Sequence, residues 1–273
     1  MADKPSWHAC AVVTGAGSGI GQAFAIELAQ RKGMVICSDI NIVRAQETAT
    51  QIRQQGGQAL AIKADVSNLS DMEALAIKAE EWFSAKVNLI INNAGVGVGG
   101  QYIGAIPLKD WKWAIDINLW GVINGCHVFA PKLREQGHGG IINVCSAASF
   151  AAAPLMGPYN VSKAAVLALS ETLAAEMRGT NVTVTALCPT FVKTNITKDG
   201  RITSESASFA DKVMSAIGTS PKKIAIKTLN DFDRGKLYTI PQLDAQFIWR
   251  AKRLLPSLYT HGAGVLNRLV TKH

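Results

Sequence analysis

The chain has 273 residues, of which 48% are hydrophobic and 18% charged, so it can bury a large core and holds no tract polar enough to stay disordered. Its formal net charge of +8 is uneven, because the residues from 221 onward hold ten Lys or Arg and three Asp, a net charge of +7. No apolar run is long enough to span a bilayer, and the first residues lack the layout of a secretory signal. We therefore expect a soluble, cytoplasmic protein whose basicity belongs to its C-terminal tail.

Five cysteines are scattered along the chain, most of them in apolar runs: Cys10, Cys37, Cys126, Cys145 and Cys188. They form no CxxC pair, and neither they nor the histidines show the spacing of metal ligands. We expect buried free thiols in a reducing compartment, and no metal site.

Short apolar runs alternate with segments of helical period along the first two thirds of the chain. The expected strands are residues 8–14, 34–39, 58–65, 87–95, 140–147 and 181–189. The expected helices between them are residues 20–32, 42–55, 70–84, 110–136 and 159–178. Buried strands that alternate with helices predict an α/β fold, a doubly wound parallel sheet with helices on both faces, in a single domain.

The alternation stops near residue 189, and no linker marks a second domain. We expect residues 8–194 to form a dinucleotide-binding and catalytic core, and residues 195–220 to form a loop-and-helix insertion beside the substrate. Residues 221–273 form a basic C-terminal tail with an amphipathic helix, and residues 237–241 within it are a candidate last strand.

A glycine-rich turn, TGAGSGIG, joins the first strand to the first helix. Gly15 permits a tight turn, Gly19 lets the backbone approach a pyrophosphate, and Gly21 allows close packing of helix on sheet. Asp39 ends the second strand about 20 residues later, where a carboxylate would bind ribose hydroxyls and repel a 2′-phosphate. The alternative for Asp39 is a helix N-cap.

The glycine turn holds no basic residue, so the pattern favours NAD over NADP as the cofactor. Arg44 could still reach a 2′-phosphate, although its spacing is more typical of a solvated helix residue. An NADPH-dependent carbonyl reductase is therefore kept as an alternative.

The spacing TGxxxGxG resembles that of the short-chain dehydrogenase/reductase family, and further motifs of this family follow in order over residues 8–195. Asp65 and Val66 match its adenine-contacting pair, and residues 92–95 match its NNAG motif. The residues that match its catalytic tetrad are Asn118, Ser146, Tyr159 and Lys163. The resemblance implies a nicotinamide-dependent oxidoreductase.

The resemblance also implies a set of cofactor-binding residues: Gly15, Ser18, Gly19, Ile20, Gly21, Asp39, Asp65, Val66, Asn92, Ala94, Gly95, Tyr159, Lys163, Pro189, Thr190, Val192 and Thr194. Val192 and Thr194 match the positions that usually contact the nicotinamide carboxamide. Thr190 departs from the family pattern, which usually has glycine after the proline at Pro189. This departure bears on the local backbone and on closure around the cofactor.

Tyr159 and Lys163 are four residues apart on an expected helix, so their side chains share one face. A unit charge about 4 Å away is worth roughly 4 kcal/mol at an effective dielectric of about 20, or about 3 pKa units. Lys163 would thus lower the pKa of Tyr159 toward neutrality, where a general acid–base works best, while desolvation opposes this shift. The resemblance implies that Lys163 also binds the ribose, that Ser146 orients the substrate and that Asn118 supports a water chain.

These features predict hydride transfer between NAD(H) and an alcohol/ketone or alcohol/aldehyde pair, without metal and with Tyr159 as the general acid/base. The alternative from another class is a cofactor-binding regulatory protein without turnover. Such a protein would be expected to lose Tyr159 or Lys163, and this chain keeps both.

The expected substrate walls lie at the carboxyl ends of the strands, in residues 96–103, 147–157 and 195–220. The stretch AAAPLM at residues 151–156 makes the second wall apolar, and the first two walls hold no charged residue. We expect a hydrophobic substrate, such as an aromatic, steroid-like, retinoid-like or long-chain alcohol or ketone. The alternative is that these alanines only pack.

The tail contains PQLDAQFIWRAKRLLP, with Arg250, Lys252 and Arg253 among apolar residues. The apolar residues that fall near one helical face are Leu243, Phe247, Ile248, Ala251, Leu254 and Leu255. One interpretation is an interfacial helix that draws the protein to anionic lipid. The favoured alternative is a helix that covers the substrate cleft or a neighbouring subunit. Nucleic acid is not expected, because the aromatic residues match no binding-module pattern.

Trp111, Trp113 and Trp120 lie in the expected helix at residues 110–136. The resemblance implies that this helix and the Tyr159 helix form the interface of a homodimer or homotetramer. The sequence alone equally allows these tryptophans to pack in the core.

Overall fold

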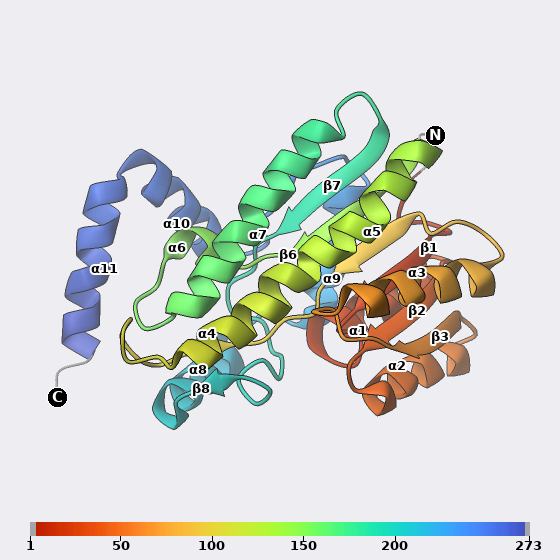
Figure 1. The fold of residues 1–273 in the computed structure, drawn as a ribbon. Coiled ribbons are helices and arrows are strands. Elements are labelled where there is room, and N and C mark those ends of the chain that lie inside the picture. Colours follow the sequence, from red (N-terminus) through yellow and green to blue (C-terminus); the bar gives the residue numbers. More distant parts are fainter. Residues whose placement is uncertain (1–3, 271–273) are drawn as a thin grey trace.

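The computed structural model of the protein describes residues 4–270 and contains a seven-stranded parallel sheet between layers of helices (Figure 1). The strand order is β3-β2-β1-β4-β6-β7-β9. The strands are β1 (Cys10–Thr14), β2 (Met34–Asp39), β3 (Gln58–Lys63), β4 (Leu89–Asn92), β6 (His138–Val144), β7 (Asn181–Leu187) and β9 (Tyr238–Thr239). The predicted doubly wound α/β fold is confirmed, and the candidate strand at residues 237–241 joins the sheet edge as β9.

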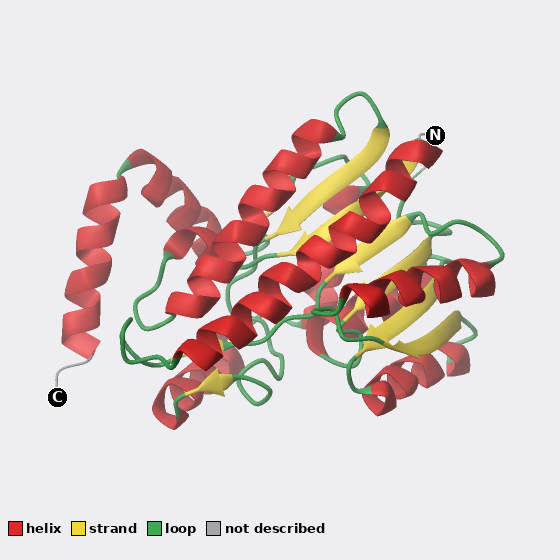
Figure 2. Ribbon diagram, viewed as in Figure 1, coloured by secondary structure: helices red, strands yellow, loops and turns green. Residues whose placement is uncertain are grey.

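Helices cover both faces of the sheet (Figure 2). One layer consists of α3 (Leu69–Phe83), α5 (Gly121–Gln136) and α7 (Gly157–Glu176). The other layer consists of α1 (Gly19–Gln30), α2 (Ile42–Gln54) and α9 (Pro221–Phe232). This arrangement leaves the carboxyl ends of the parallel strands open for a ligand.

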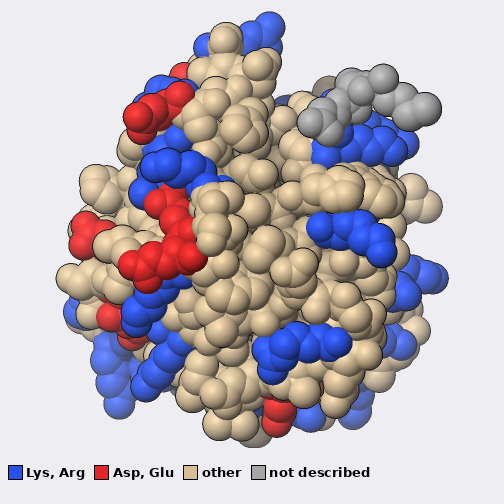
Figure 3. Space-filling model, turned by 90° about the vertical axis from the view of Figure 1, so that its right-hand side faces the viewer, with Lys and Arg blue, Asp and Glu red and all other residues tan. Residues whose placement is uncertain are grey.

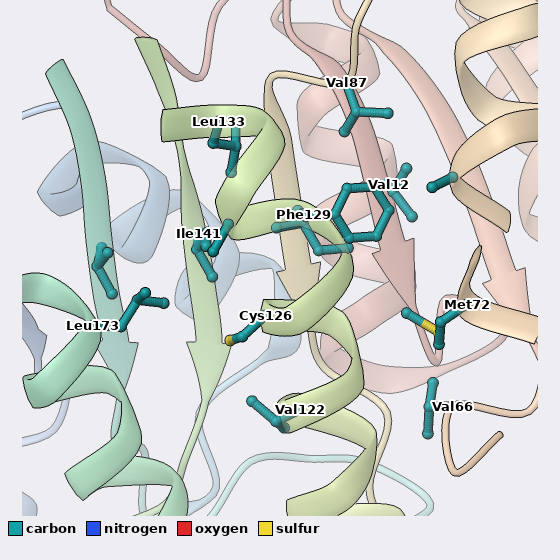
Figure 4. Close-up of a cluster of buried hydrophobic side chains, with 14 of the residues drawn as sticks. Val12, Val66, Met72, Val87, Val122, Cys126, Phe129, Leu133, Ile141 and Leu173 are labelled. Carbon is teal, nitrogen blue, oxygen red and sulfur yellow. The ribbon is translucent and has the colours of Figure 1, made fainter. Parts of the chain in front are cut away.

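Each face of the sheet has its own core, because successive strand residues point to opposite sides. In β1, Val12 joins the core beneath α3, α5 and α7, whereas Ala11 and Val13 join the core beneath α1, α2 and α9. Figure 4 shows the first core, in which Phe129 of α5 lies between Val12 and Ile141. The glycine turn and Asp39 are thereby held on a rigid, buried sheet.

The expected helix at residues 110–136 forms as α4 (Leu108–Ile115) and α5, joined by a π-helical turn at Asp116–Trp120. Such turns often occur at functional sites, and this one carries the buried Asn118. Trp111 and Trp113 pack against a small buried cluster under the neighbouring loop, whereas Trp120 is 51% exposed. Core packing therefore accounts for two of these three tryptophans.

The insertion at residues 195–220 forms β8 (Arg201–Ile202) and α8 (Ser204–Ile217). The strand β8 pairs in parallel with β5 (Val98–Gly99), which follows the NNAG motif. Arg201 donates to Asp110 at 2.7 Å, and its guanidinium stacks 4.1 Å from the ring centroid of Trp113. The insertion is thus fastened to the start of α4 beside the expected substrate cleft.

The C-terminal tail has two parts. Helix α9 and strand β9 belong to the main body, where Ile224, Leu229 and Phe232 are buried. Helix α10 (Leu243–Leu254) contacts α6 (Ala148–Ala151). The chain then turns back as α11 (Pro256–Val270), the helix labelled α11 that extends from the body in Figure 1. Residues 271–273 of the expected tail lie outside the described residues. Between residues 4 and 270, no helix is both long and apolar enough to cross a membrane.

Charge on the surface is partly balanced by neighbouring charge of opposite sign. On the face shown in Figure 3, Lys and Arg side chains are dispersed, and several of them lie beside Asp or Glu. Elsewhere, Lys132 pairs with Glu80 between α5 and α3 at 3.1 Å.

Candidate active site

The glycine turn has the backbone geometry that a close-approaching ligand needs. Gly15 and Gly19 have φ angles of +62° and +57°, a region that L side chains rarely adopt. A Cβ atom on Gly21 would collide with the carbonyl oxygen of Gly15. Ser18 stands at the N-cap of α1 but makes no side-chain capping hydrogen bond, while Ile20 packs against the core. The first N–H groups of α1 are therefore placed to receive a pyrophosphate.

Asp39 lies beside this turn at the end of β2. Its carboxylate accepts the N–H of Gly17 at 2.9 Å and the N–H of Asn41 at 2.9 Å. The N-cap of α2 is Asn41, whose side chain accepts from two N–H groups of the first turn, so the alternative that Asp39 is the N-cap is wrong. The partly buried carboxylate fits the ribose of a dinucleotide seated on the turn.

Arg44 flanks the same turn, since a Cβ atom on Gly17 would lie 2.6 Å from the Cβ atom of Arg44. Its guanidinium donates to both carboxylate oxygens of Asp199, at 2.9 and 3.3 Å. Asp199 belongs to the insertion, so this ion pair joins the insertion to the adenosine end of the expected cofactor site.

Asn93 is a structural residue of the site that the sequence analysis missed. Its amide nitrogen donates to the carbonyl oxygens of Thr14 at 2.8 Å and Gly15 at 3.1 Å. The hydroxyl oxygen of Thr14 accepts the N–H groups of Asn93 and Ala94, at 3.0 and 3.1 Å. The NNAG motif therefore holds the glycine turn in place, a role that its position at the end of the neighbouring strand could have indicated.

The side chain of Asn92 does not face the glycine turn. It is buried, it donates to Asn143 of β6 at 2.9 Å, and it lies close enough to Gly125 of α5 to exclude a Cβ there. Side chains of consecutive residues in a strand point to opposite faces of the sheet. The side chain of Asn93 therefore points toward the glycine turn, and that of Asn92 points away from it. A contact between Asn92 and the cofactor would therefore be made by its backbone, and the assignment of Asn92 to the cofactor site stays a prediction.

Asp65 and Val66 lie at the carboxyl end of β3, on the adenine side of the expected site. The carboxylate of Asp65 accepts both the N–H and the hydroxyl of Ser67, at 2.9 and 2.7 Å. Val66 is buried against Gly121 at the start of α5, and its carbonyl accepts from Asn124 at 2.9 Å. These contacts fix the turn that would border the adenine.

Ser146, Tyr159 and Lys163 come together where β6 ends and α7 begins. Ser146 follows β6, and its hydroxyl accepts the N–H of Ala148 at 3.1 Å and lies close enough to the phenol of Tyr159 to lower its pKa. Lys163 is 3% exposed; its Nζ atom donates to the carbonyl oxygen of Val144 at 2.7 Å and lies 6.0 Å from the ring centroid of Tyr159. The helix therefore presents the tyrosine and the lysine on one side, as their spacing predicts.

Asn118 is fully buried in the π-helical turn. Its side chain accepts the N–H of Val96 at 2.7 Å and donates to the carbonyl of Val96 at 2.9 Å and to the hydroxyl of Ser162 at 3.2 Å. A Cβ atom on Gly95 would lie 3.0 Å from Oδ1 of Asn118 and 3.3 Å from Nζ of Lys163. The last glycine of the NNAG motif thus lies between these two side chains.

Burial governs the protonation of the pair formed by Tyr159 and Lys163. Burial raises the pKa of Tyr159, and the hydrogen bond from Ser146 only partly opposes it. Burial lowers the pKa of Lys163. In the protein without cofactor, Lys163 does not lower the pKa of Tyr159 as the sequence analysis expected. The reason is that the Lys163 ammonium is itself desolvated and donates to the carbonyl oxygen of Val144.

The departure at Thr190 has a structural role. Its N–H donates to the side chain of Gln242 at 3.2 Å, and its hydroxyl donates to Asp244 at 3.1 Å. Gln242 also donates to the carbonyl of Phe191 at 3.3 Å. The threonine therefore ties the segment after β7 to the N-terminus of α10.

The rest of this segment covers the glycine turn. The carbonyl of Pro189 accepts the N–H of Ala147 at 2.8 Å, Val192 is buried, and the methyl group of Thr194 would touch a Cβ atom on Gly19 at 3.0 Å. Residues that match nicotinamide contacts thus lie over the turn that would hold the pyrophosphate.

The three expected substrate walls lie next to one another. The first and third are joined by the pairing of β5 with β8. The first and second meet where Gly100 donates to the carbonyl of Leu155 at 2.8 Å and where Gly99 lies against Met156. The three expected walls are therefore joined by backbone pairing and by the contact of Met156 with Gly99.

All five cysteines are free, and four of them are buried. Within residues 4–270, no group of three or more His, Cys, Asp or Glu side chains is placed to hold a metal ion.

The sequence profile of the short chain dehydrogenase family matches residues 9–205. The chain therefore belongs to the short-chain dehydrogenase/reductase family, whose members are oxidoreductases. The resemblance to this family is confirmed.

Two curated relatives show the breadth of the match. The chain is 31% identical over 255 residues to the probable oxidoreductase EphD of Mycobacterium tuberculosis. This match covers 89% of this chain but 43% of that relative. It is 33% identical over 189 residues to the 7alpha-hydroxysteroid dehydrogenase of Escherichia coli, covering 69% of this chain and 73% of that relative. The chain thus spans less than half the length of EphD.

Two solved structures share the fold. A short-chain dehydrogenase/reductase from Burkholderia phymatum in complex with NAD has a TM-score of 0.86 and 31% identity, covering 91% of this chain and 94% of that chain. A short-chain dehydrogenase from Sphingobium yanoikuyae in complex with NADPH has a TM-score of 0.77 and 26% identity, covering 96% and 95%. Members of the family with this fold therefore bind NAD or NADPH.

Proposed function

We propose that this chain is an NAD(H)-dependent oxidoreductase that transfers a hydride between nicotinamide and a hydrophobic alcohol or ketone. The observation that carries the proposal is the cluster of Ser146, Tyr159 and Lys163 at the carboxyl end of β6, next to the NNAG motif that holds the glycine turn. A proton-transfer group and a dinucleotide cradle therefore share one edge of the sheet.

The residues fit the cofactor, which supplies the hydride chemistry when it is bound. Tyr159 takes the hydroxyl proton of an alcohol or returns a proton to a carbonyl oxygen. The hydroxyl of Ser146, which lies close to the phenol, would hold the same substrate oxygen. Lys163 stays buried beside the tyrosine ring, where its ammonium would stabilise the tyrosinate that accepts the substrate proton.

Two carboxylates support a preference for NAD over NADP. Asp39 lies beside the glycine turn, where it would accept ribose hydroxyls and repel a 2′-phosphate. Asp199 forms an ion pair with the guanidinium of Arg44. Arg44 is the basic residue that could otherwise bind a 2′-phosphate in spite of Asp39. The NADPH-bound structure of a relative keeps an NADPH-dependent carbonyl reductase as the second candidate.

The apolar walls support a hydrophobic substrate. The wall at residues 147–157 holds no charged group, and its Met156 meets the backbone of Gly99 across the cleft. A relative that acts on hydroxysteroids shows that this fold accommodates such molecules elsewhere in the family. A charged substrate would lack a partner in the walls at residues 96–103 and 147–157.

We also propose that α5 and α7 form an interface between copies of the chain. Trp120, the last residue before α5, and Val161 of α7 support this, because about half of each side chain is exposed. The free and mostly buried cysteines support a reducing compartment such as the cytoplasm.

Parallel titrations of the purified protein with NADH and NADPH, followed by assays of hydrophobic alcohols and ketones, test the proposed function. We expect tighter binding of NADH and turnover of at least one apolar secondary alcohol. Tighter binding of NADPH would favour the carbonyl reductase, and binding without turnover of any alcohol or ketone would favour a regulatory protein.

A further inference from the structure

Helix α10 turns its large apolar side chains away from the protein. Leu243, Phe247 and Leu254 are 81%, 73% and 77% exposed. Their spacing of four and seven residues places them on one side of the helix. On the opposite side, Ala245 is fully buried and Trp249 lies against the ring of Tyr238, with centroids 6.0 Å apart.

Polar and aromatic contacts fix this orientation. Asp244 accepts the hydroxyl of Thr190 at 3.1 Å at the start of the helix. Near its end, the guanidinium of Arg253 lies 4.2 Å from the ring centroid of Trp249. The hydroxyl of Tyr259 in α11 donates to the carbonyl of Ala151 at 3.0 Å. The aliphatic side chains of α10 are therefore free for another surface.

Helix α11 continues the apolar surface. Leu255, at the end of α10, and Leu258 and Val265 of α11 are 57%, 66% and 45% exposed. This helix also contains Gly262 and Gly264, the residue type that favours a helix least after proline. An exposed helix with two interior glycines needs a partner to stabilise it, because isolated helices of this length are marginal in water.

The charges around this surface are almost all positive. Between residues 243 and 270 the chain holds four cations, Arg250, Lys252, Arg253 and Arg268, and one acid, Asp244. The carboxylate of Asp244 is held by Thr190. Lys252 and Arg253 lie against the rings of Tyr259 and Trp249. Arg250 and Arg268 are exposed. A stripe of large apolar side chains accompanied by exposed arginines matches the interface of an anionic bilayer.

We propose that α10 and α11 form a docking surface for anionic lipid bilayers. The six exposed apolar side chains enter the interfacial layer, and Arg250 and Arg268 contact acidic headgroups. A second copy of the chain fits this surface less well, because a two-fold interface would place the same cations opposite one another. The lipid surface would lie beside α6, since Tyr259 joins α11 to the wall of the substrate cleft.

Vesicle flotation tests the proposal without any assay of activity. The protein is mixed with vesicles of phosphatidylcholine alone or of phosphatidylcholine with phosphatidylglycerol. We expect flotation with the anionic vesicles, a loss of binding at high salt, and at least a severalfold weaker binding to the neutral vesicles.

Variants identify the surface. Phe247→Ser and Leu258→Ser are each expected to weaken partitioning about tenfold or more, because each removes one large apolar side chain from the interface. Arg250→Glu and Arg268→Glu are expected to reduce binding to the anionic vesicles. The matched control is Ile77→Ser on α3, where the replaced side chain is 56% exposed and binding should not change.

Two results would overturn the proposal. One is the absence of flotation with anionic vesicles, or an equal loss of binding in the control variant. The other is a change from oligomer to monomer in Phe247→Ser or Leu258→Ser, measured by light scattering without vesicles, since a second copy would then cover this surface. Circular dichroism checks that each variant is folded.

Discussion

The guanidinium of Arg44 and the carboxylate of Asp199 form a two-point ion pair between residues that are 155 positions apart in the chain. The pair joins α2, which flanks the glycine turn, to the insertion at residues 195–220. It also neutralises the cation that could otherwise receive the 2′-phosphate of NADP. We therefore expect the Arg44–Asp199 ion pair to affect both the choice of cofactor and the position of the insertion.

Replacing Asp39 is expected to weaken the preference for NADH. Asp39→Ala removes a charged acceptor of the ribose hydroxyls, which is worth about 1.5–3 kcal/mol, so the ratio of NADPH to NADH Kd should fall by roughly 10- to 100-fold. Adding Asp199→Asn frees Arg44 and should improve NADPH affinity further, by a few-fold at most because the pair is exposed. Fluorescence titration of both variants measures these ratios, and an unchanged ratio in Asp39→Ala would remove Asp39 from this role.

The pH dependence of turnover should follow the protonation of Tyr159. Burial raises the pKa of this phenol, so alcohol oxidation, which needs the tyrosinate, should increase as pH rises through that pKa. Ketone reduction, which needs the phenol, should decrease over the same range. Initial rates in both directions across alkaline pH test this, and two profiles of the same sign would contradict the assignment.

Asp231 should contribute to the free energy of unfolding at neutral pH, and this contribution should be lost in acid. Burial alone would raise the pKa of this carboxyl, but hydrogen bonds from Lys227 and Lys236, at 2.6 and 2.9 Å, hold the pKa below its ordinary value. A lowered folded pKa gives stability that is present above the ordinary value of about 3.9 and is lost as pH falls through the folded pKa.

Asp231→Asn is therefore expected to lower the free energy of unfolding by about 1–3 kcal/mol at neutral pH, and by much less near pH ~2. Urea denaturation of both proteins at the two pH values measures the difference. An equal difference at both values would mean that the charge of Asp231 has no part in stability.

Thr190 should hold the C-terminal helices against the body. Thr190→Val removes the hydrogen bond to Asp244, worth about 0.5–1.5 kcal/mol, and keeps the side-chain shape. We expect trypsin to cut near Arg250 roughly 2- to 10-fold faster in this variant, as the local opening equilibrium rises. Thr190→Ser keeps the hydroxyl and serves as the control, and equal cleavage rates in all three proteins would contradict the role.

The sequence predicted the features that depend on local spacing. The glycine turn, Asp39 and the pair of Tyr159 and Lys163 are each set by the residues of one strand, turn or helix, so their positions follow from short-range geometry. The structural role of Asn93 was missed, because the motif does not say which of its two asparagines faces the turn.

Contacts between residues far apart in the chain could not be predicted from the sequence. The partner of Arg44 lies in the distant insertion, and the use of Thr190 as a tie to α10 depends on where the tail returns. Periodicity indicated which residues of α10 share a face, but not that contacts of Trp249 and Asp244 turn that face outward.

The most direct test of the central claim is a comparison of the unchanged protein with Tyr159→Phe, measuring NADH affinity and alcohol turnover in the same samples. The account predicts equal NADH affinity and a fall in turnover of about 10²- to 10⁴-fold, because only the proton-transfer group is lost. Near-equal turnover in the two proteins would contradict the assignment of Tyr159 as the general acid/base.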